Sequence, residues 1–200
     1  MPVALKSLVD KIPDFSKAKF SEINPRDGIT SKIPDFSQND DKFSRFLPEN
    51  NGKWEGAKGD SVWVPQDVFV PLKHNLEGLT WEKIKEIYKF KHIPFSDGEP
   101  DFTEVSKSTV KIIDFSISRN GNFTQADEKC ADQWTKENKD GKIWSPEDVK
   151  AYRKENCLSW HERSDQNTMD LIPSIIHGNI PHSGGISAAK SGENNEQKNN

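Results

Sequence analysis

Three of the chain's five histidines lie within the segment Leu158–Gly185. His161, His177 and His182 offer neutral imidazole nitrogens, and three such ligands with open coordination positions suit a divalent metal ion that must also touch a substrate. Closeness along the chain does not prove that the rings converge, because clustered histidines can also serve in packing alone. The chemistry to look for is therefore a three-histidine metal site.

The residues around these histidines predict the order strand, turn, strand and helix. CLSWHER suits a strand, SDQN a turn, and TMDLIP a second strand that Pro173 ends. Ser174 is expected to cap a short helix, IIHGNI, which the next proline breaks. His161 then lies on the first strand, His177 on the helix and His182 just beyond it. A strand–strand–helix unit can bring its first strand against its helix.

Other residues near the cluster favour structural roles. Asp165 and Asp170 are typical of turn and surface positions rather than of metal ligands. Trp160 is expected in the core beneath the site, with stacking on a base as the alternative. His74 and His92 have no acid or histidine partner nearby, so we expect them at the surface or in packing.

The patterns WHE, TMDLIP and IHGNIPHSGG resemble the nuclease toxins of the HNH/endonuclease VII superfamily, and in particular the group with a Trp-His-His or Trp-His-Glu signature. The likeness runs from Leu158 to about Lys190. It implies an α+β fold class, with a ββα-metal nuclease core near the C-terminus and additional helices and short strands. NGKWEGAKGDSVWVP is also similar, more loosely, to the region that precedes such modules in bacterial polymorphic toxins.

The resemblance implies a metal-dependent endonuclease, a phosphodiester hydrolase that uses one divalent ion (Zn, Mg, Mn or Ni) at the scissile phosphate. By the match, His161, His177 and His182 are metal ligands, and Glu162 stands where many relatives carry the histidine that acts as base. The alternative register makes His161 the base and Glu162 a ligand or orienting residue. The two face opposite sides of a flat strand, so both can act at one site only if the strand is bulged or sharply bent.

Candidate contacts to phosphate are Arg153, Lys154 and Arg163, although each can also be read as part of a solvated face. The backbone N–H groups and the hydroxyl of HSGG are a further candidate. Net charge does not identify a nucleic-acid-binding region, because the chain carries −4 overall and residues 105–190 hold 12 basic and 12 acidic side chains. Any site for a polyanion must therefore be local.

The same resemblance implies a secreted effector of interbacterial competition, acting in the target-cell cytoplasm on nucleic acid, DNA favoured over RNA. A cognate immunity protein would protect the producer, either by facing Arg153, Lys154 and Arg163 with acidic groups or by covering a neighbouring surface. No membrane partner is expected, because no apolar run approaches the ~20 residues of a membrane span. The N-terminal MPVALKSLVD is too short and too charged for a signal peptide.

Two alternatives belong to other functional classes. The same fold can hold a structural metal and bind a partner without cleaving it, as a metal-stabilised binding module. It can also be a structural domain in which the histidines only pack. Metal titration combined with a cleavage assay separates the three, because a nuclease needs both binding and turnover, a binding module needs only binding, and a packing domain needs neither.

The rest of the chain predicts further elements. Helices are expected from a Thr124 cap to Gly141 and after Ser145, where Pro146 and Asp148 complete a strong start signal. Cys130 and Cys157 lack a CxxC pattern and are expected as free thiols packed on helices, with a mutual disulfide as the alternative.

The chain is expected to divide into four segments. These are residues 1–50, extended and linker-like with KIPDFS at 11–16 and 32–37; residues 51–104, an accessory region with short strands and a helix after Thr80; residues 105–190, the nuclease domain; and residues 191–200, a disordered tail.

Overall fold

The computed structural model describes residues 46–196, with side chains described for 46–190. The described residues all belong to one compact unit. Both copies of KIPDFS lie outside the described residues, so the extended, linker-like segment expected there stays a prediction.

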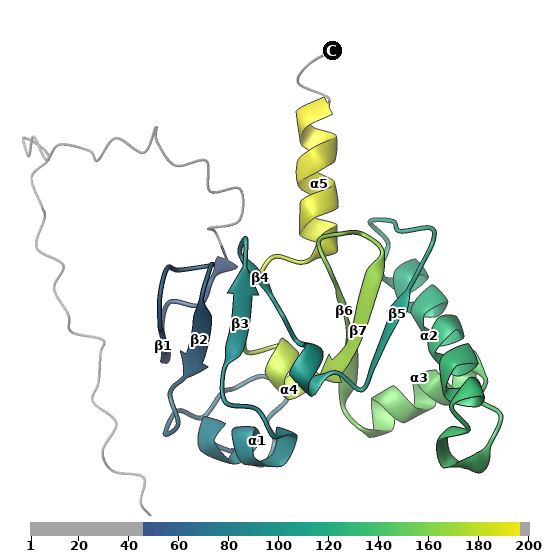
Figure 1. Ribbon diagram of the computed structural model, residues 1–200, viewed down its shortest axis with the longest axis horizontal. Coiled ribbons are helices and arrows are strands. Elements are labelled where there is room, and N and C mark those ends of the chain that lie inside the picture. The colour runs from purple at the N-terminus through teal and green to yellow at the C-terminus, as the bar shows by residue number, and fades with distance from the viewer. Residues whose placement is uncertain (1–45, 197–200) are drawn as a thin grey trace, which may run out of the picture. The chain divides into compact units, whose positions relative to one another are not determined.

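A first antiparallel sheet has four short strands in the order β1-β2-β3-β4 (Figure 1). Helix α1 lies between β2 and β3 along the chain. It begins where the Thr80 side chain accepts from the backbone N–H of Lys83, and it ends at Lys89, whose φ is 61°. The expected helix after Thr80 is therefore confirmed. The elements are β1 Gly52–Trp54, β2 Val62–Pro65, α1 Trp81–Tyr88, β3 Ile93–Ser96 and β4 Glu99–Pro100.

A second antiparallel sheet has the order β5-β7-β6 and carries the histidine segment. Its central strand β7 is buried along its whole length, and β6 forms one edge. The two strands pair without interruption from Leu158 opposite Pro173 to Glu162 opposite Met169. The two expected strands and the turn between them are confirmed. The elements are the 3-10 helix η3 Thr103–Val105, β5 Ser108–Lys111, β6 Leu158–Glu162 and β7 Thr168–Pro173.

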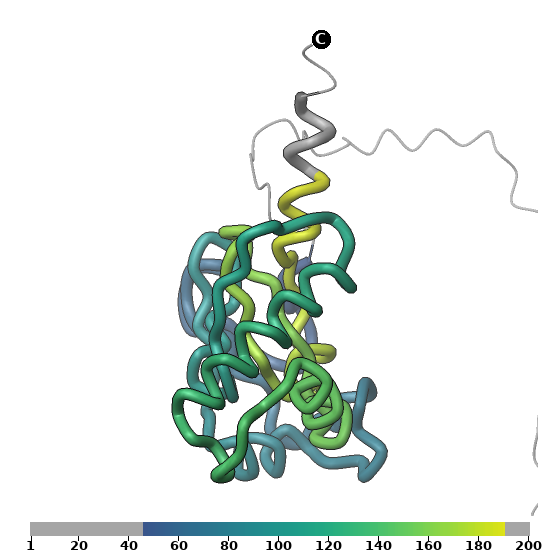
Figure 2. Tube along the Cα trace, turned by 90° about the vertical axis from the view of Figure 1, so that its right-hand side faces the viewer, coloured from purple at the N-terminus to yellow at the C-terminus, as the bar shows by residue number. Residues whose placement is uncertain are grey.

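Helices α2, Arg119–Lys136, and α3, Pro146–Glu155, cover one face of the second sheet, as Figure 2 shows from the side of these helices. The capping box of Ser145 and Asp148 starts α3 as expected. The expected start of α2 at Thr124 was wrong, because the turn-forming run Asn-Gly-Asn lies inside the helix. The Asn122 side chain bonds the backbone of Ser116 there, which offsets its low helix propensity.

Two helices follow β7. Helix α4, Ser174–His177, has Pro173 rather than Ser174 at its N-cap and is shorter than expected. Helix α5 is Gly185–Glu196 and includes residues 191–196 of the tail that was expected to be disordered. Polar composition alone gave that expectation, whereas a helix that has already started can continue through polar residues. Residues 197–200 lie outside the described part of the chain.

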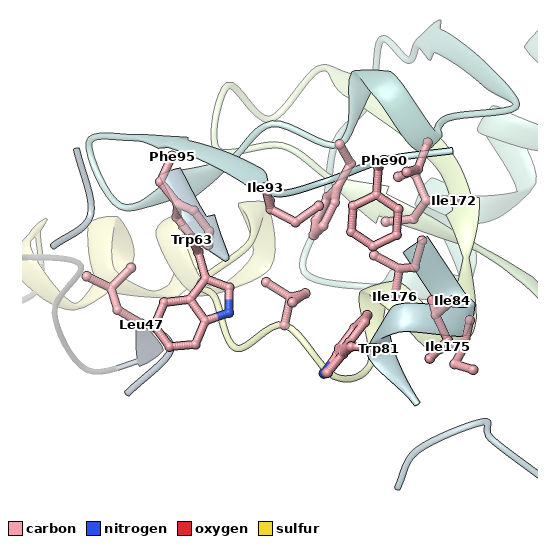
Figure 3. Packing of buried hydrophobic residues seen from close by; sticks show 13 residues of the cluster. Leu47, Trp63, Trp81, Ile84, Phe90, Ile93, Phe95, Ile172, Ile175 and Ile176 are labelled. Carbon is pink, nitrogen blue, oxygen red and sulfur yellow. The ribbon is translucent and has the colours of Figure 1, made fainter. Parts of the chain in front are cut away.

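Two hydrophobic cores lie on opposite faces of the second sheet. Ile172, Ile175 and Ile176 pack with Trp81 and Phe90 in the first core, which is shared with the first sheet and α1 (Figure 3). The expected boundary between residues 104 and 105 therefore does not separate two compact bodies. The second core lies under α2 and α3 and is made by Val110, Ile112, Ala126, Cys130, Ala131, Trp134, Trp144, Val149, Leu158, Trp160, Met169 and Leu171.

Both cysteines are free, as expected. Cys130 is buried in the second core, and this burial raises the pKa of its thiol to about 12. Cys157 is exposed between α3 and β6 rather than packed on a helix. Within residues 46–196 the structure has no helix both long and apolar enough to cross a membrane.

Candidate metal centre and active site

The three histidines of the C-terminal segment meet at one point. Their candidate ligand atoms all lie within 4.8 Å of one another, and their ring centroids are 4.9 to 5.3 Å apart. Two nitrogens bound to one tetrahedral zinc ion at about 2.1 Å each lie about 3.4 Å apart. Small ring rotations would therefore close the set around a single ion.

Local structure explains why these rings converge. His161 lies on β6 opposite Asp170 of β7, and α4 follows β7 directly, so the helix folds back beside β6. His177 is the last residue of α4. His182 Nδ1 is 2.7 Å from the carbonyl oxygen of Ile180, and as a donor to that oxygen it leaves Nε2 as the free ligand atom.

Phe102 forms an apolar wall for the cluster. Its ring is fully buried and meets all three imidazoles edge to face, with centroid distances of 5.0 Å to His161, 6.1 Å to His177 and 5.5 Å to His182. Phe102 precedes η3 and lies in the region expected to be accessory. That region therefore helps to build the site.

Burial keeps the three imidazoles neutral. It lowers the pKa of His161 well below its ordinary value of 6.5, and the neighbouring His182 and His177 add to the effect. Burial, followed by the charges of His182 and Arg119, lowers the pKa of His177 to about 3. Burial also lowers the pKa of His182. At neutral pH all three rings are in the unprotonated form that binds a metal ion.

The Nε2 atom of His161 is the one buried side-chain nitrogen or oxygen among the described residues that has no hydrogen-bond partner. Leaving such an atom unpaired costs about 1–3 kcal/mol. His161 belongs to the cluster with His177 and His182. The three histidines are therefore suited to hold a metal ion, and His161 Nε2 would be one of its ligands.

Glu162 lies on the opposite face of β6 from His161. The β6–β7 pairing runs through both residues, so the bulge that we expected as a condition for a shared site is absent from this strand. Because β6 is an edge strand, the two side chains flank the same edge of the sheet. Glu162 is 6% exposed; its Oε1 accepts from Asn122 Nδ2 at 2.9 Å, and its Oε2 lies 3.5 Å from Arg119 Nε.

Asn122 and Arg119 were missed by the sequence reasoning. Asn122 is fully buried: its Nδ2 also donates to the carbonyl of Ser116 at 2.8 Å, and its Oδ1 accepts from the Ser116 N–H at 3.0 Å. The side chain of Arg119 is 66% exposed. The only local signal was the polar run SRNGN, which reads equally well as a loop.

The two glycines of HSGG let the chain pass against the end of β6. A Cβ on Gly184 would lie 3.1 Å from the carbonyl oxygen of Glu162, and a Cβ on Gly185 would lie 2.5 Å from that of Arg163. This close packing is enough to account for both glycines, so they do not by themselves indicate a phosphate site.

Arg153 is held by a buried carboxylate. Its Nε and Nη2 donate to the two oxygens of Asp127 at 2.8 and 2.9 Å, and Asp127 also accepts from Trp160 Nε1 at 2.8 Å. Trp160 is 1% exposed and lies in the second core. These contacts give Arg153 a structural role, and they do not support the expected contact with phosphate.

Arg163 is held in a similar way. Its Nε donates to Asp170 Oδ2 at 2.6 Å and its Nη2 to Thr103 Oγ1 at 3.1 Å. Asp170 is fully buried and also accepts from Thr109 Oγ1, so its expected surface position was wrong. The cause is the ion pair with Arg163, seven residues away in the β6–β7 hairpin. Asp165 is a turn residue as expected, accepting from the N–H groups of residues 167 and 168.

The other predicted residues are not members of the histidine cluster. Lys154 is exposed in the last turn of α3, and α3 leads into the Leu158 end of β6, opposite to Glu162. His74 is exposed and His92 half-buried, and neither is in the histidine cluster.

Comparison with known families adds an independent observation. Residues 92–184 match the family model described as the DNase/tRNase domain of colicin-like bacteriocin. The matched range contains the three clustered histidines and Glu162. No curated protein matches the chain. The family match supports a bacteriocin-type nuclease toxin domain in this part of the chain.

Proposed function

We propose that this domain is a metal-dependent endonuclease of the ββα-metal type, in the Trp-His-Glu group of HNH nucleases, and that it hydrolyses nucleic-acid phosphodiesters, DNA in preference to RNA. One observation carries the proposal. Three neutral imidazoles converge, one buried and two half-buried, and the buried His161 has an unpartnered Nε2, inside a segment that matches colicin-like nuclease domains.

His161, His177 and His182 would hold one divalent ion. When bound, that ion would stabilise the charge that develops on the phosphate and the leaving oxygen. An all-imidazole ligand set favours zinc or nickel over magnesium, which prefers oxygen ligands.

Glu162 would take a proton from the attacking water. Its carboxylate is held by the buried amide of Asn122 and lies beside the exposed guanidinium of Arg119, so it has a fixed direction and a cation nearby. The alternative register, with His161 as base, is less well supported. His161 Nε2 has the other two imidazoles as neighbours, whereas Glu162 has its contacts on the other face of β6.

The biological setting follows from the similarity to colicin-like bacteriocins. The domain would act as a secreted effector in interbacterial competition, with the target-cell cytoplasm as its place of action. The producing cell would then need a cognate immunity protein. Expression of the wild type without the product of the adjacent gene should kill a bacterial host, and His161→Ala should be harmless.

Plasmid cleavage by the purified protein, with and without a chelator, tests the proposed activity. A nuclease should cleave with added divalent metal and stop when the chelator is present. Metal binding without cleavage would favour the metal-stabilised binding module. Neither binding nor cleavage would mean that the histidines only pack.

A further inference from the structure

Phosphates of a nucleic acid need cationic partners near the histidine cluster, and two of the three cations expected from the sequence are already paired with buried carboxylates. Arg153 is paired with Asp127, and Arg163 with Asp170. Lys154 lies toward the opposite end of β6 from Glu162. Other cations must therefore be considered.

Arg119 is the first residue of α2 and lies beside the site. Its Nε is 3.5 Å from Glu162 Oε2, one residue along β6 from His161. A guanidinium has five N–H donors, and the Arg119 side chain is 66% exposed. It can therefore keep its contact with Glu162 and still offer a pair of donors to a phosphate.

Lys73 approaches the site from the loop between β2 and α1. Asn179 holds this loop against α4: its Oδ1 accepts from the Lys73 N–H at 3.0 Å, and its Nδ2 donates to the Lys73 carbonyl at 2.7 Å. The fit is close at Gly178, where an added Cβ would lie 3.1 Å from His74 and 3.4 Å from Lys73 Cβ. Gly178 directly follows His177, so the exposed Lys73 is fixed beside a candidate metal ligand.

The two cations come from separate elements on either side of the cluster. Arg119 begins α2, where its Nε is 3.5 Å from Glu162 Oε2, and Lys73 lies in the loop between β2 and α1, where Asn179 holds its backbone.

We infer that Arg119 and Lys73 bind the phosphates of a nucleic-acid strand on two sides of the histidine cluster. This inference rests on the proposed function, because the ligand is the substrate of the same site. Lys73 lies outside the range 92–184 that matches colicin-like nuclease domains. The segment before the matched domain therefore contributes to substrate binding as well as to the shared core.

The test is the binding of a fluorescent duplex oligonucleotide by the full chain in chelator, where bound metal cannot support cleavage. Arg119→Ala and Lys73→Ala should each weaken binding roughly tenfold at low salt. Each should also reduce the slope of log affinity against log salt by about 1, because one phosphate contact is lost. Arg119→Lys, which keeps the charge, should retain most of the affinity.

Matched controls each remove one exposed charge elsewhere. The first control is Lys136→Ala. Lys136 lies at the other end of α2, 17 residues from Arg119, which corresponds to about 25 Å along the helix. Lys150→Ala lies on α3 and is the control for Lys73. Both should bind like the wild type. Thermal melts should show all variants folded, since the substituted side chains are exposed.

Failure of the inference and failure of the proposed function give different results. If the wild type cleaves plasmid with metal, and Arg119→Ala and Lys73→Ala bind no worse than their controls, the inference is overturned while the nuclease proposal stands. If the wild type leaves plasmid intact with every divalent metal, the proposed function fails. Weakened binding by the two variants alone would then still support a polyanion site.

Discussion

Asn122 donates its amide to Glu162 Oε1 at 2.9 Å, on the face of β6 opposite to the three histidines. The same amide donates to the backbone of Ser116, so its direction is fixed from two sides. One buried asparagine thus ties the loop before α2 to the carboxylate proposed as the base.

Replacing Asn122 by Ala should lower kcat for plasmid cleavage by about 10–100-fold, because the Glu162 carboxylate loses the partner that aims it. Metal affinity, measured by calorimetry, should not change. In the Glu162→Gln background the same replacement should have little further effect on kcat, since a positioning residue acts through the group that it holds.

Gln125→Ala is the matched control for Asn122→Ala. Gln125 anchors the same loop from the same helix, through the backbone of residues 113 and 114, without contact to Glu162. Its loss should leave kcat unchanged. An equal loss of activity in both variants, or additive losses in the double mutant, would show that Asn122 serves the loop and not the carboxylate.

Glu162→Gln should separate metal binding from chemistry. Glutamine keeps the hydrogen bond to Asn122 but cannot accept the proton of the attacking water, so cleavage should fall by about 10²–10⁴-fold. Metal affinity should stay at the wild-type value. Full activity would favour His161 as the base, and lost metal affinity would make Glu162 a ligand.

Arg153→Ala should reduce stability and leave nucleic-acid affinity unchanged. Asp127 is 4% exposed, and without Arg153 it would be a buried carboxylate with only Trp160 as a side-chain partner. The free energy of unfolding in urea should fall on the order of 3 kcal/mol. A stable variant with weaker oligonucleotide binding would restore the role that the sequence suggested for this arginine.

The sequence predicted those elements whose signals are local. The capping box at Ser145, the Thr80 cap and the strand-like run CLSWHER each lie within a few residues, and each marked its helix or strand correctly. The spacing of histidines and the WHE pattern likewise brought out the cluster, because its ligands lie in one short unit.

Features that depend on distant residues could not be predicted. Arg153 and Asp127 are 26 residues apart, and nothing near either one marks the pair. The shared first core joins Trp81 to Ile176, so no local pattern could show that the accessory segment and the C-terminal sheet form one body. Lys73 escaped notice for the same reason, since Asn179, 106 residues away, places it.

Stability without metal should depend on pH in a defined direction. The three clustered histidines are neutral when folded because burial lowers their pKa values, that of His177 to about 3, whereas the unfolded chain protonates them near pH 6.5. Below pH 6.5 the unfolded state therefore binds more protons, and stability falls as the pH falls.

Urea unfolding of the metal-free protein between pH 7.5 and about pH 5 measures this effect, above the range where most carboxylates titrate. Each buried histidine should contribute up to about 1.4 kcal/mol per pH unit. His177→Asn should reduce the number of protons taken up on unfolding by one, and the slope of stability against pH should fall accordingly. A free energy of unfolding that does not change over this range would mean that the histidines are not buried as neutral groups.

The most direct test of the central claim is to add metal to the metal-free protein in measured ratios and to follow the return of plasmid cleavage. Metal-free wild type should be inactive, and its activity should rise linearly with added zinc or nickel and level off at one ion per chain. His177→Ala and His182→Ala should stay inactive at that ratio and bind the ion orders of magnitude more weakly, whereas His92→Ala should behave like the wild type. Cleavage that persists in chelator, or wild-type metal affinity in either ligand variant, would contradict the account.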